Sequence, residues 1–205
     1  MNASCQVSHS STGVTIRNAP KMKYVSIDIE TTGLDPDICQ VLELGAVIED
    51  WERPVAQLPV FRRVLIRKEI CGEPVALAMN AGLLKLIAGR QDPPDSCLPA
   101  ELGRQFAAWL TLHGVDPLHV QPAGKNFANF DAQFLKRLTR FNEHVHFKHR
   151  TLDPAMLFWN LSTDETLPDS KTCMERAGID GEVAHTAVED ALSVVRMIRY
   201  AVSHK

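Results

Sequence analysis

The chain has 205 residues, with 22 Lys and Arg against 25 Asp and Glu, which gives a formal net charge of −3 at pH 7. Hydrophobic residues make up 45% and charged residues 23%, which is typical of one globular domain with its own core and excludes an intrinsically disordered chain. The charge balance also excludes a protein that coats nucleic acid by bulk positive charge, so any nucleic-acid contact needs a local basic patch or bound metal ions.

The N-terminal segment, residues 1–20, is polar and rich in Ser and Thr. It lacks the apolar stretch of a signal peptide and predicts a flexible tail ahead of one domain over 21–205. The five cysteines form no C-x-x-C pair, and no apolar run approaches the ~18 residues of a membrane span. We therefore expect a cytoplasmic protein without membrane contact.

Three strands are predicted next, over 21–29, 40–49 and 58–66, from period-two alternation of β-branched and aromatic residues. Gly and Pro in 31–37 mark the first turn. The hydrophobic period then becomes helical over 74–88 and 100–113, with a loop at 91–99 between them.

The second half of the chain alternates strands and helices. A short strand over 119–123 precedes a helix over 129–141, and another short strand ends near Leu152. Asp153 and Pro154 predict the N-cap and first residue of a further helix, and two more helices follow over 168–177 and 187–202. This order predicts a mixed sheet flanked by helices in one α/β domain.

The first motif that carries chemistry is the pair Asp28 and Glu30 in the first predicted strand. Residues two apart in a strand share a face, so both carboxylates point one way while Ile27 and Ile29 point to the core. Adjacent like charges are unfavourable unless a cation lies between them, and Mg²⁺ prefers carboxylate oxygens. A solvated acidic strand end is the alternative that this motif alone leaves open.

The second motif lies at the start of the helix over 129–141. Asn129 is a good N-cap, which places Asp131 in the first turn, where the helix dipole favours an ionised carboxylate. An acid that merely caps a helix is the simpler interpretation of this feature in isolation.

The third motif spans residues 185–190. Thr186 and Glu189 form the T-x-x-E pattern of a capping box, which predicts a helix that starts at Thr186. His185 and Asp190 then occupy the two positions that meet across such a helix start. A lone histidine at a helix entry is usually structural, but its pairing with a carboxylate favours a functional role.

Together, the segments SIDIETTGLD, NFANFDAQFL and HTAVEDALSV resemble the three motifs of the DEDD superfamily of 3′→5′ exonucleases, in its histidine-containing DEDDh (DnaQ-like) branch. The resemblance runs from about residue 23 to 200, and the order of the motifs suits that family. It implies a ribonuclease H-like α/β fold with a five-stranded mixed sheet flanked by helices. Many members have His-Asn where this chain has Asn126-Phe127.

The resemblance also implies the site. Two Mg²⁺ ions, or Mn²⁺, would be bound by Asp28, Glu30, Asp131 and Asp190, with His185 as the general base that deprotonates the attacking water. It further implies contacts to the 3′-terminal nucleotide, which are assigned to Thr31, Leu34 and Asn126.

The expected activity is 3′→5′ exonucleolytic release of nucleoside monophosphates from single-stranded nucleic acid, with DNA favoured as the partner over RNA. One alternative is an oligoribonuclease-like or RNA-trimming enzyme, and another is a non-catalytic nucleic-acid-binding module. A homodimer is left open. Three histidines in FNEHVHFKHR could suggest a second metal site, but such spacing in a polar connection favours solvated side chains.

Overall fold

The computed structural model describes residues 22–89, 95–179 and 186–204. Its centre is a five-stranded sheet in the order β4-β3-β2-β1-β5. β1, β2 and β3 are antiparallel neighbours, whereas β4 runs parallel to β3 and β5 runs parallel to β1. The mixed sheet and its three opening strands are therefore confirmed. The strands are β1 (Val25–Thr31), β2 (Val41–Ile48), β3 (Val60–Leu65), β4 (Ser96–Cys97) and β5 (Pro122–Ala123).

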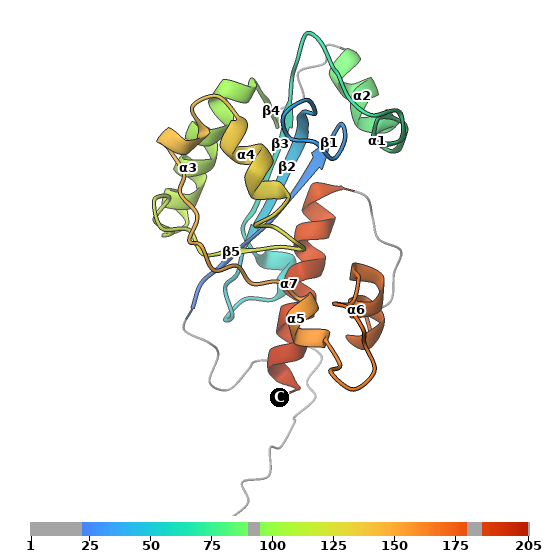
Figure 1. Cartoon of the computed structure of the whole chain (residues 1–205). Coiled ribbons are helices and arrows are strands. Elements are labelled where there is room, and N and C mark those ends of the chain that lie inside the picture. The colour runs from blue at the N-terminus through green and yellow to red at the C-terminus, as the bar shows by residue number, and fades with distance from the viewer. Residues whose placement is uncertain (1–21, 90–94, 180–185, 205) are drawn as a thin grey trace, which may run out of the picture.

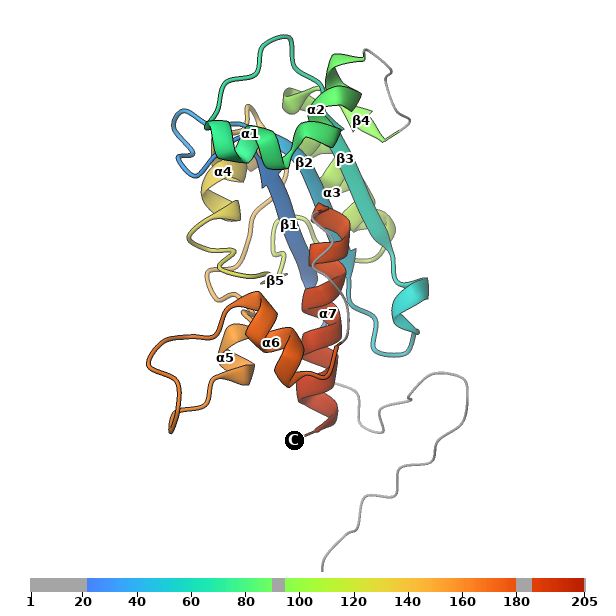
Figure 2. The ribbon, with the colours of Figure 1, turned by 90° about the vertical axis from the view of Figure 1, so that its right-hand side faces the viewer.

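Helices cover both faces of the sheet, which gives three layers (Figure 1). On one face lie α3 (Leu102–Leu112) and α4 (Asp131–Arg137). On the other face lie α7 (Ala187–Ser203), α5 (Ala155–Phe158) and α6 (Ser170–Arg176). The two short helices α1 (Pro74–Met79) and α2 (Ala81–Ala88) lie beyond the end of β1 (Figure 2).

The sheet separates two hydrophobic clusters. Ile27 and Ile29 of β1 are buried with side chains of α3 and α4, including Phe106 and Phe134. Because side chains alternate along a strand, Asp28 and Glu30 lie on the opposite face, under α7. The contact of Ser26 with α7 agrees with this assignment, since its hydroxyl donates to the carbonyl of Ala191 at 2.8 Å. The alternation therefore places both acidic side chains on one face.

Several predicted boundaries were wrong, and tertiary contacts explain two of them. The helix predicted over 74–88 is two helices that divide at Asn80, whose amide donates to the carbonyl of Thr31 at 3.2 Å. The loop predicted at 91–99 contains β4, which exists only through parallel pairing with Val64 and Leu65.

Two predicted N-caps were also wrong. Asn129 does not cap α4, because the capping residue is Phe130 and the Asn129 amide donates to Asn126 Oδ1 at 3.1 Å. The residue before α5 is Pro154 rather than Asp153, although Asp153 Oδ1 still accepts from the Ala155 N–H at 2.9 Å. The predicted tail over 1–20 lies outside the described residues. None of the described helices is both long and apolar enough to cross a membrane.

Candidate active site

Three carboxylates from distant parts of the sequence meet beside β1. One oxygen each from Asp28, Glu30 and Asp190 lies within 4.8 Å of the other two. Asp28 and Glu30 are half-buried on β1, and Asp190 is buried in the first turn of α7. Three carboxylate oxygens in so small a space suit a hard divalent cation, which prefers oxygen ligands and offsets the repulsion between the acids.

The start of α7 is fixed by hydrogen bonds from its own cap and from β2. Thr186 Oγ1 accepts from the Glu189 N–H at 3.3 Å, which confirms the predicted N-cap. The buried Glu43 of β2 accepts from the Ala187 N–H at 3.2 Å and also from Arg62 Nε at 2.5 Å. These bonds satisfy N–H groups that a helix start otherwise leaves unpaired and attach the helix to the sheet.

A glycine in β2 allows α7 to approach the sheet closely. Gly45 lies opposite Asp28 in the β1–β2 register. A Cβ atom at Gly45 would lie 2.3 Å from the carbonyl carbon of Ala187 and 2.4 Å from the Val188 nitrogen. The missing side chain therefore lets the first turn of α7 pack over the strand pair, which brings Asp190 to Asp28.

A fourth carboxylate, Asp131, reaches the cluster from the first residue of α4. Its Oδ1 accepts from the Ile29 N–H at 3.1 Å, and its side chain is buried. Along β1, β5 pairs with Val25 and Ser26, so the part of the edge at Ile29 has α4 rather than β5 beside it. The hydrogen bond orients Asp131 toward the strand that carries Asp28 and Glu30.

Burial and mutual repulsion make the cluster costly to ionise. Burial raises the pKa of Asp28 well above its ordinary value, and the nearby charges of Asp131 and Asp190 raise it further. Burial also raises the pKa of Asp131 to about 7, although its backbone hydrogen bonds act in the opposite direction. Compensating positive charge at this site would therefore be strongly favourable.

Lys125 supplies part of that positive charge, and the sequence motifs did not identify it. Its Nζ lies 2.8 Å from Asp190 Oδ1, and its side chain is only 22% exposed. Its charge lowers the pKa of both Asp28 and Asp131. The available signal was a lysine directly after Gly124, next to the second motif, but a single lysine there has no pattern that separates it from a solvated one.

The predicted substrate residues differ in what they expose. The Leu34 side chain is 73% exposed, and its N–H donates to Glu73 Oε1 at 3.1 Å. Thr31 is buried, with its hydroxyl donating to the Gly33 carbonyl at 2.8 Å, so its side chain is engaged within its own loop. Asn126 is exposed with a positive φ of 54°, and its N–H donates to Asp153 Oδ2 at 2.9 Å.

The helix α1 adds an apolar rim beside this loop. None of its residues is buried, and its Val75 and Met79 side chains are 72% and 66% exposed. The preceding residue, Glu73, joins the helix to the loop by donating its N–H to the Thr32 carbonyl at 2.7 Å. Large exposed apolar side chains are therefore present both on this loop, at Leu34, and on the helix that is joined to it.

Two histidine predictions have different outcomes. His185 lies outside the described residues, directly before the Thr186 that caps α7. Within the described ranges, the acid cluster is the one group of three His, Cys, Asp or Glu side chains arranged to hold a metal. His144, His146 and His149 form no such group, and His146 Nε2 lies 2.8 Å from the Asn142 carbonyl.

The chain is similar to known nucleases in sequence and in fold. No protein-family model matches the sequence. It is 27% identical over 184 residues to an oligoribonuclease of Shewanella oneidensis, covering 85% of this chain and 90% of that protein. Sequence similarity thus extends over most of both chains.

Solved nuclease structures share the architecture at lower identity. Escherichia coli exonuclease I in complex with a dA16 oligonucleotide superposes with a TM-score of 0.61 at 15% identity over 89% of this chain. Cell-death related nuclease 4 (CRN-4) superposes with a TM-score of 0.61 at 13% identity over 89% of this chain. The chain spans 41% of exonuclease I and 64% of CRN-4, so the shared part is one nuclease-like fold unit.

Proposed function

We propose that this chain, a DEDDh-type 3′→5′ exonuclease of the ribonuclease H-like superfamily, removes nucleotides one at a time from the 3′ end of single-stranded nucleic acid. The observation that carries the proposal is the convergence of Asp28, Glu30 and Asp190 within 4.8 Å, with Asp131 beside them. No other charged group of the described structure has a comparable donor set for hard cations.

The four carboxylates fit a divalent-metal site. Asp28, Glu30 and Asp190 would hold one ion, and Asp28 with Asp131 would hold a second. Two Mg²⁺ or Mn²⁺ ions bound there would stabilise the attacking and the leaving oxygen of an in-line displacement at phosphorus. We assign His185 to accept the proton of the attacking water, because an imidazole with an ordinary pKa near ~6.5 suits that transfer.

Residues around the acid cluster would position the strand. Leu34 and the neighbouring apolar side chains of α1 are exposed and can pack against the 3′-terminal base and its neighbour. The exposed Asn126 can donate or accept hydrogen bonds from the sugar or base. Attack by water then breaks the bond from phosphorus to the 3′ oxygen of the preceding nucleotide, and a nucleoside 5′-monophosphate leaves.

The preferred substrate is the open part of the proposal. From the sequence we expect DNA, whereas the relative in Shewanella oneidensis is an oligoribonuclease, which favours trimming of short RNA. The exonuclease I structure holds single-stranded DNA. We therefore retain short single-stranded RNA as the second candidate substrate.

One side-by-side assay separates these substrates. Matched 5′-labelled DNA, RNA and dinucleotides are incubated with the chain and Mg²⁺ or Mn²⁺, and products are resolved at single-nucleotide resolution. Stepwise shortening from the 3′ end is expected for at least one strand, and faster turnover of dinucleotides or RNA would select the RNA-trimming candidate. Internal cleavage, or no cleavage with either metal, would contradict the proposal.

The role of His185 gives a separate prediction. Replacing His185 with Gln removes the base but keeps a polar side chain, and we expect the turnover rate to fall by about 10²–10⁴-fold. The pH profile of the single-turnover rate, measured between pH 5.5 and 9, should also lose the limb that reports the ionisation of the histidine. The exposed His149 offers a matched control, since His149→Gln should leave both rate and pH profile unchanged. If His185→Gln keeps the wild-type rate and pH profile, another group accepts the proton of the attacking water.

A further inference from the structure

A cavity of about 410 Å³ lies on the α4 side of the loop that carries Leu34. Its walls come from that loop, the start of β2, the segment after β3 and the end of α4. This volume is within the range of about 300–1,000 Å³ in which proteins bind small ligands or parts of larger ones. Its lining residues include Asp37, Gln40, Val41, Arg67, Phe134 and Arg137.

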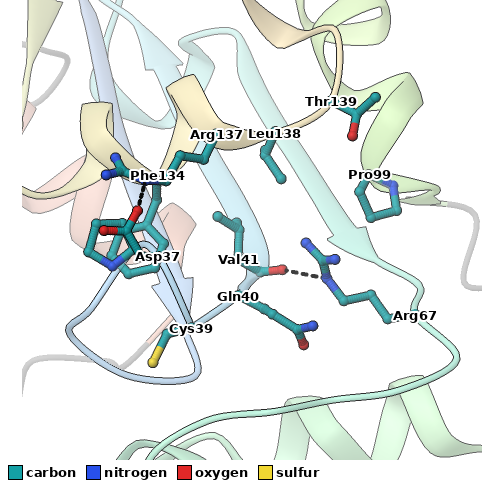
Figure 3. A pocket seen from close by; sticks show the side chains of 11 residues that line it. Asp37, Cys39, Gln40, Val41, Arg67, Pro99, Phe134, Arg137, Leu138 and Thr139 are labelled. Carbon is teal, nitrogen blue, oxygen red and sulfur yellow. Dashed lines mark hydrogen bonds and ion pairs between the residues drawn. The ribbon is translucent and has the colours of Figure 1, made fainter.

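Two arginine side chains line this cavity from different elements, with Val41 and Gln40 between them (Figure 3). Arg137 comes from α4, and its Nε lies 2.6 Å from Asp37 Oδ1. Arg67 follows β3 by two residues, and its Nε donates to the Val41 carbonyl at a long 3.4 Å. Within the part of the chain that the structure describes, the cavity therefore combines one paired guanidinium with one whose hydrogen bond is a weak carbonyl contact.

Arg67 has the properties of an anion-binding residue. It is partly buried, and burial lowers its pKa, which means that its charge has lost hydration. Within residues 22–89, 95–179 and 186–204, no carboxylate forms an ion pair with it. A partly desolvated guanidinium that offers up to five N–H donors is well suited to the planar, charge-assisted recognition of phosphate.

The segment that carries Arg67 is attached to the sheet. The N–H of Ile66, its neighbour, donates to the Cys97 carbonyl at 3.0 Å, which extends the β3–β4 pairing to the edge of the cavity. Because Arg67 directly follows this paired residue, its backbone is held more closely than that of a free loop, which reduces the ordering needed when a ligand binds.

The cavity shares α4 with the acid cluster and shares the loop after β1 with the exposed Leu34. The loop after β1 carries Leu34 on one arm and lines the cavity with Asp37 on the other. On α4, Asp131 is the first residue and Arg137 the last, which separates them by about 9 Å along the helix axis. At a rise of about 3.4 Å per stacked nucleotide, this axial distance to the Arg137 wall corresponds to roughly two or three nucleotides. Arg67 lies across the cavity from Arg137, so a strand needs at least that length to reach it from the acid cluster (Figure 3).

We propose that the cavity at Arg67 binds a backbone phosphate of the single strand, at least two or three nucleotides before the 3′ end whose terminal bond is cleaved at the acid cluster. This inference rests on the proposed exonuclease function and adds to it a second contact point for the strand. The contact makes affinity depend on strand length, because a dinucleotide is too short to reach it. Asp37, which is paired with Arg137, places a negative charge on the wall of the same cavity and would oppose the bound phosphate.

Two substitutions in one cavity predict opposite effects. Arg67→Gln removes the cation and should weaken binding of an octanucleotide by about tenfold, as expected for one charge-assisted contact. It should also reduce the slope of log K against log salt by about 0.7. Asp37→Asn removes the opposing charge and should strengthen binding. Arg104→Gln removes an equal charge from the exposed face of α3 and is the matched control.

Binding is measured by fluorescence anisotropy with 5′-labelled strands of two, four, eight and twelve nucleotides whose 3′-terminal linkages are phosphorothioates. Hydrolysis of thymidine 5′-monophosphate p-nitrophenyl ester reports on the acid cluster alone and should be unchanged in Arg67→Gln. Melting temperatures confirm that each variant folds. If the wild-type chain binds long strands through Arg67 but hydrolyses no substrate, the exonuclease function is refuted, whereas the contact of Arg67 with the strand is supported.

Three results would overturn the inference. The first is octanucleotide affinity in Arg67→Gln equal to that in Arg104→Gln. The second is weaker binding in both Arg67→Gln and Asp37→Asn, which would indicate general damage to the cavity. The third is stabilisation of the wild-type chain by inorganic phosphate, lost in Arg67→Gln, with no change in strand affinity, since the cavity would then hold a small anion instead of the strand.

Discussion

Asp28 carries the greatest electrostatic constraint in the acid cluster. Asp131 from α4 and Asp190 from α7 both raise its pKa, in addition to the effect of burial. Its charged form is therefore costly without a cation. Such strongly perturbed pKa values are common for carboxylates at functional sites. On the proposed function, Asp28 would serve the reaction at the expense of the stability of the folded state.

This conflict predicts that Asp28→Asn moves activity and stability in opposite directions. Without a ligand that can bridge cations, the rate should fall by about 10³-fold or more. Without the buried charge, the melting temperature at pH 8 in EDTA should rise. Asp116→Asn, at an exposed position outside the acid cluster, is the control for both measurements. A variant that retains the wild-type rate would refute the assignment of Asp28 as a ligand.

Lys125 yields the complementary prediction. Lys125→Met removes the ammonium from Asp190 and leaves the acids of the cluster with less compensation. We expect the melting temperature at pH 8 in EDTA to fall by about 2–4 °C, which corresponds to about 1 kcal/mol for a domain of this size. Lys136→Met, on the exposed side of α4, should have no such effect. Calorimetric or fluorimetric melting curves of both variants measure this difference in melting temperature.

At the scale of elements, the geometry depends on how closely α7 approaches β2. Gly45→Ala places a methyl group against the backbone of Ala187 and Val188, so the first turn of α7 has to move outward. Because Asp190 moves with that turn, we expect the nuclease rate to fall by about 10–10²-fold with every acid still present. Stopped-flow or gel-based rates at saturating Mg²⁺ measure this.

Gly82→Ala is the matched substitution for Gly45→Ala. A Cβ at Gly82 in α2 meets nothing within 4 Å, and alanine stabilises a helix interior by about 0.5–1 kcal/mol over glycine. Its rate should equal that of the wild type, and its melting temperature should be unchanged or higher. Equal rates in both glycine variants would show that the approach of α7 does not control the position of Asp190.

The elements that local sequence signals specify were predictable. The start of α7 follows from Thr186 and Glu189, because a capping box acts within one helical turn. The alternation of side chains along β1 is also a local signal, and it places Asp28 and Glu30 on one face. In contrast, β4 consists of two residues whose only strand signal is their pairing with Val64 and Leu65.

The site was less predictable than the strands. The proximity of Asp28, Glu30 and Asp190 was expected from the family resemblance, whereas the cause of that proximity was not. Gly45 and Glu43 position α7 from a strand about 140 residues earlier in the chain, and no local pattern predicts such a contact. Lys125 was likewise invisible as a site residue, since a basic side chain shows its role only through its neighbours.

At the scale of the whole molecule, the buried acids link stability to pH and to metal. The folded-state pKa of Asp131 is raised to about 7 and that of Asp28 is raised in the same direction. For such groups the stabilising contribution is complete below the unfolded-state pKa, near ~3.9, and is lost as pH rises through the folded-state value. In EDTA, the melting temperature should therefore fall between pH 5 and pH 8.

Divalent metal should reverse this trend. On the proposed function, Mg²⁺ would bind the ionised carboxylates, so it should raise the melting temperature clearly at pH 8 and much less at pH 5. Melting curves at both pH values, each with EDTA or Mg²⁺, measure the effect, and Asp28→Asn should weaken it. A metal effect that is equal at pH 5 and pH 8 would place the binding site elsewhere on the chain.

The hydrogen bond from the Ile29 N–H to Asp131 also bears on the choice of an inactive variant. β5 is only two residues long and pairs with β1 at Val25 and Ser26, so the buried Ile29 N–H has a side-chain acceptor instead of a strand partner. Asp131 satisfies this donor with the same carboxylate that we assign to the metal site. An inactive form for co-crystallisation with a substrate is therefore better made as Asp131→Asn, which keeps an acceptor for this N–H, than as Asp131→Ala, which would leave a buried donor unpaired.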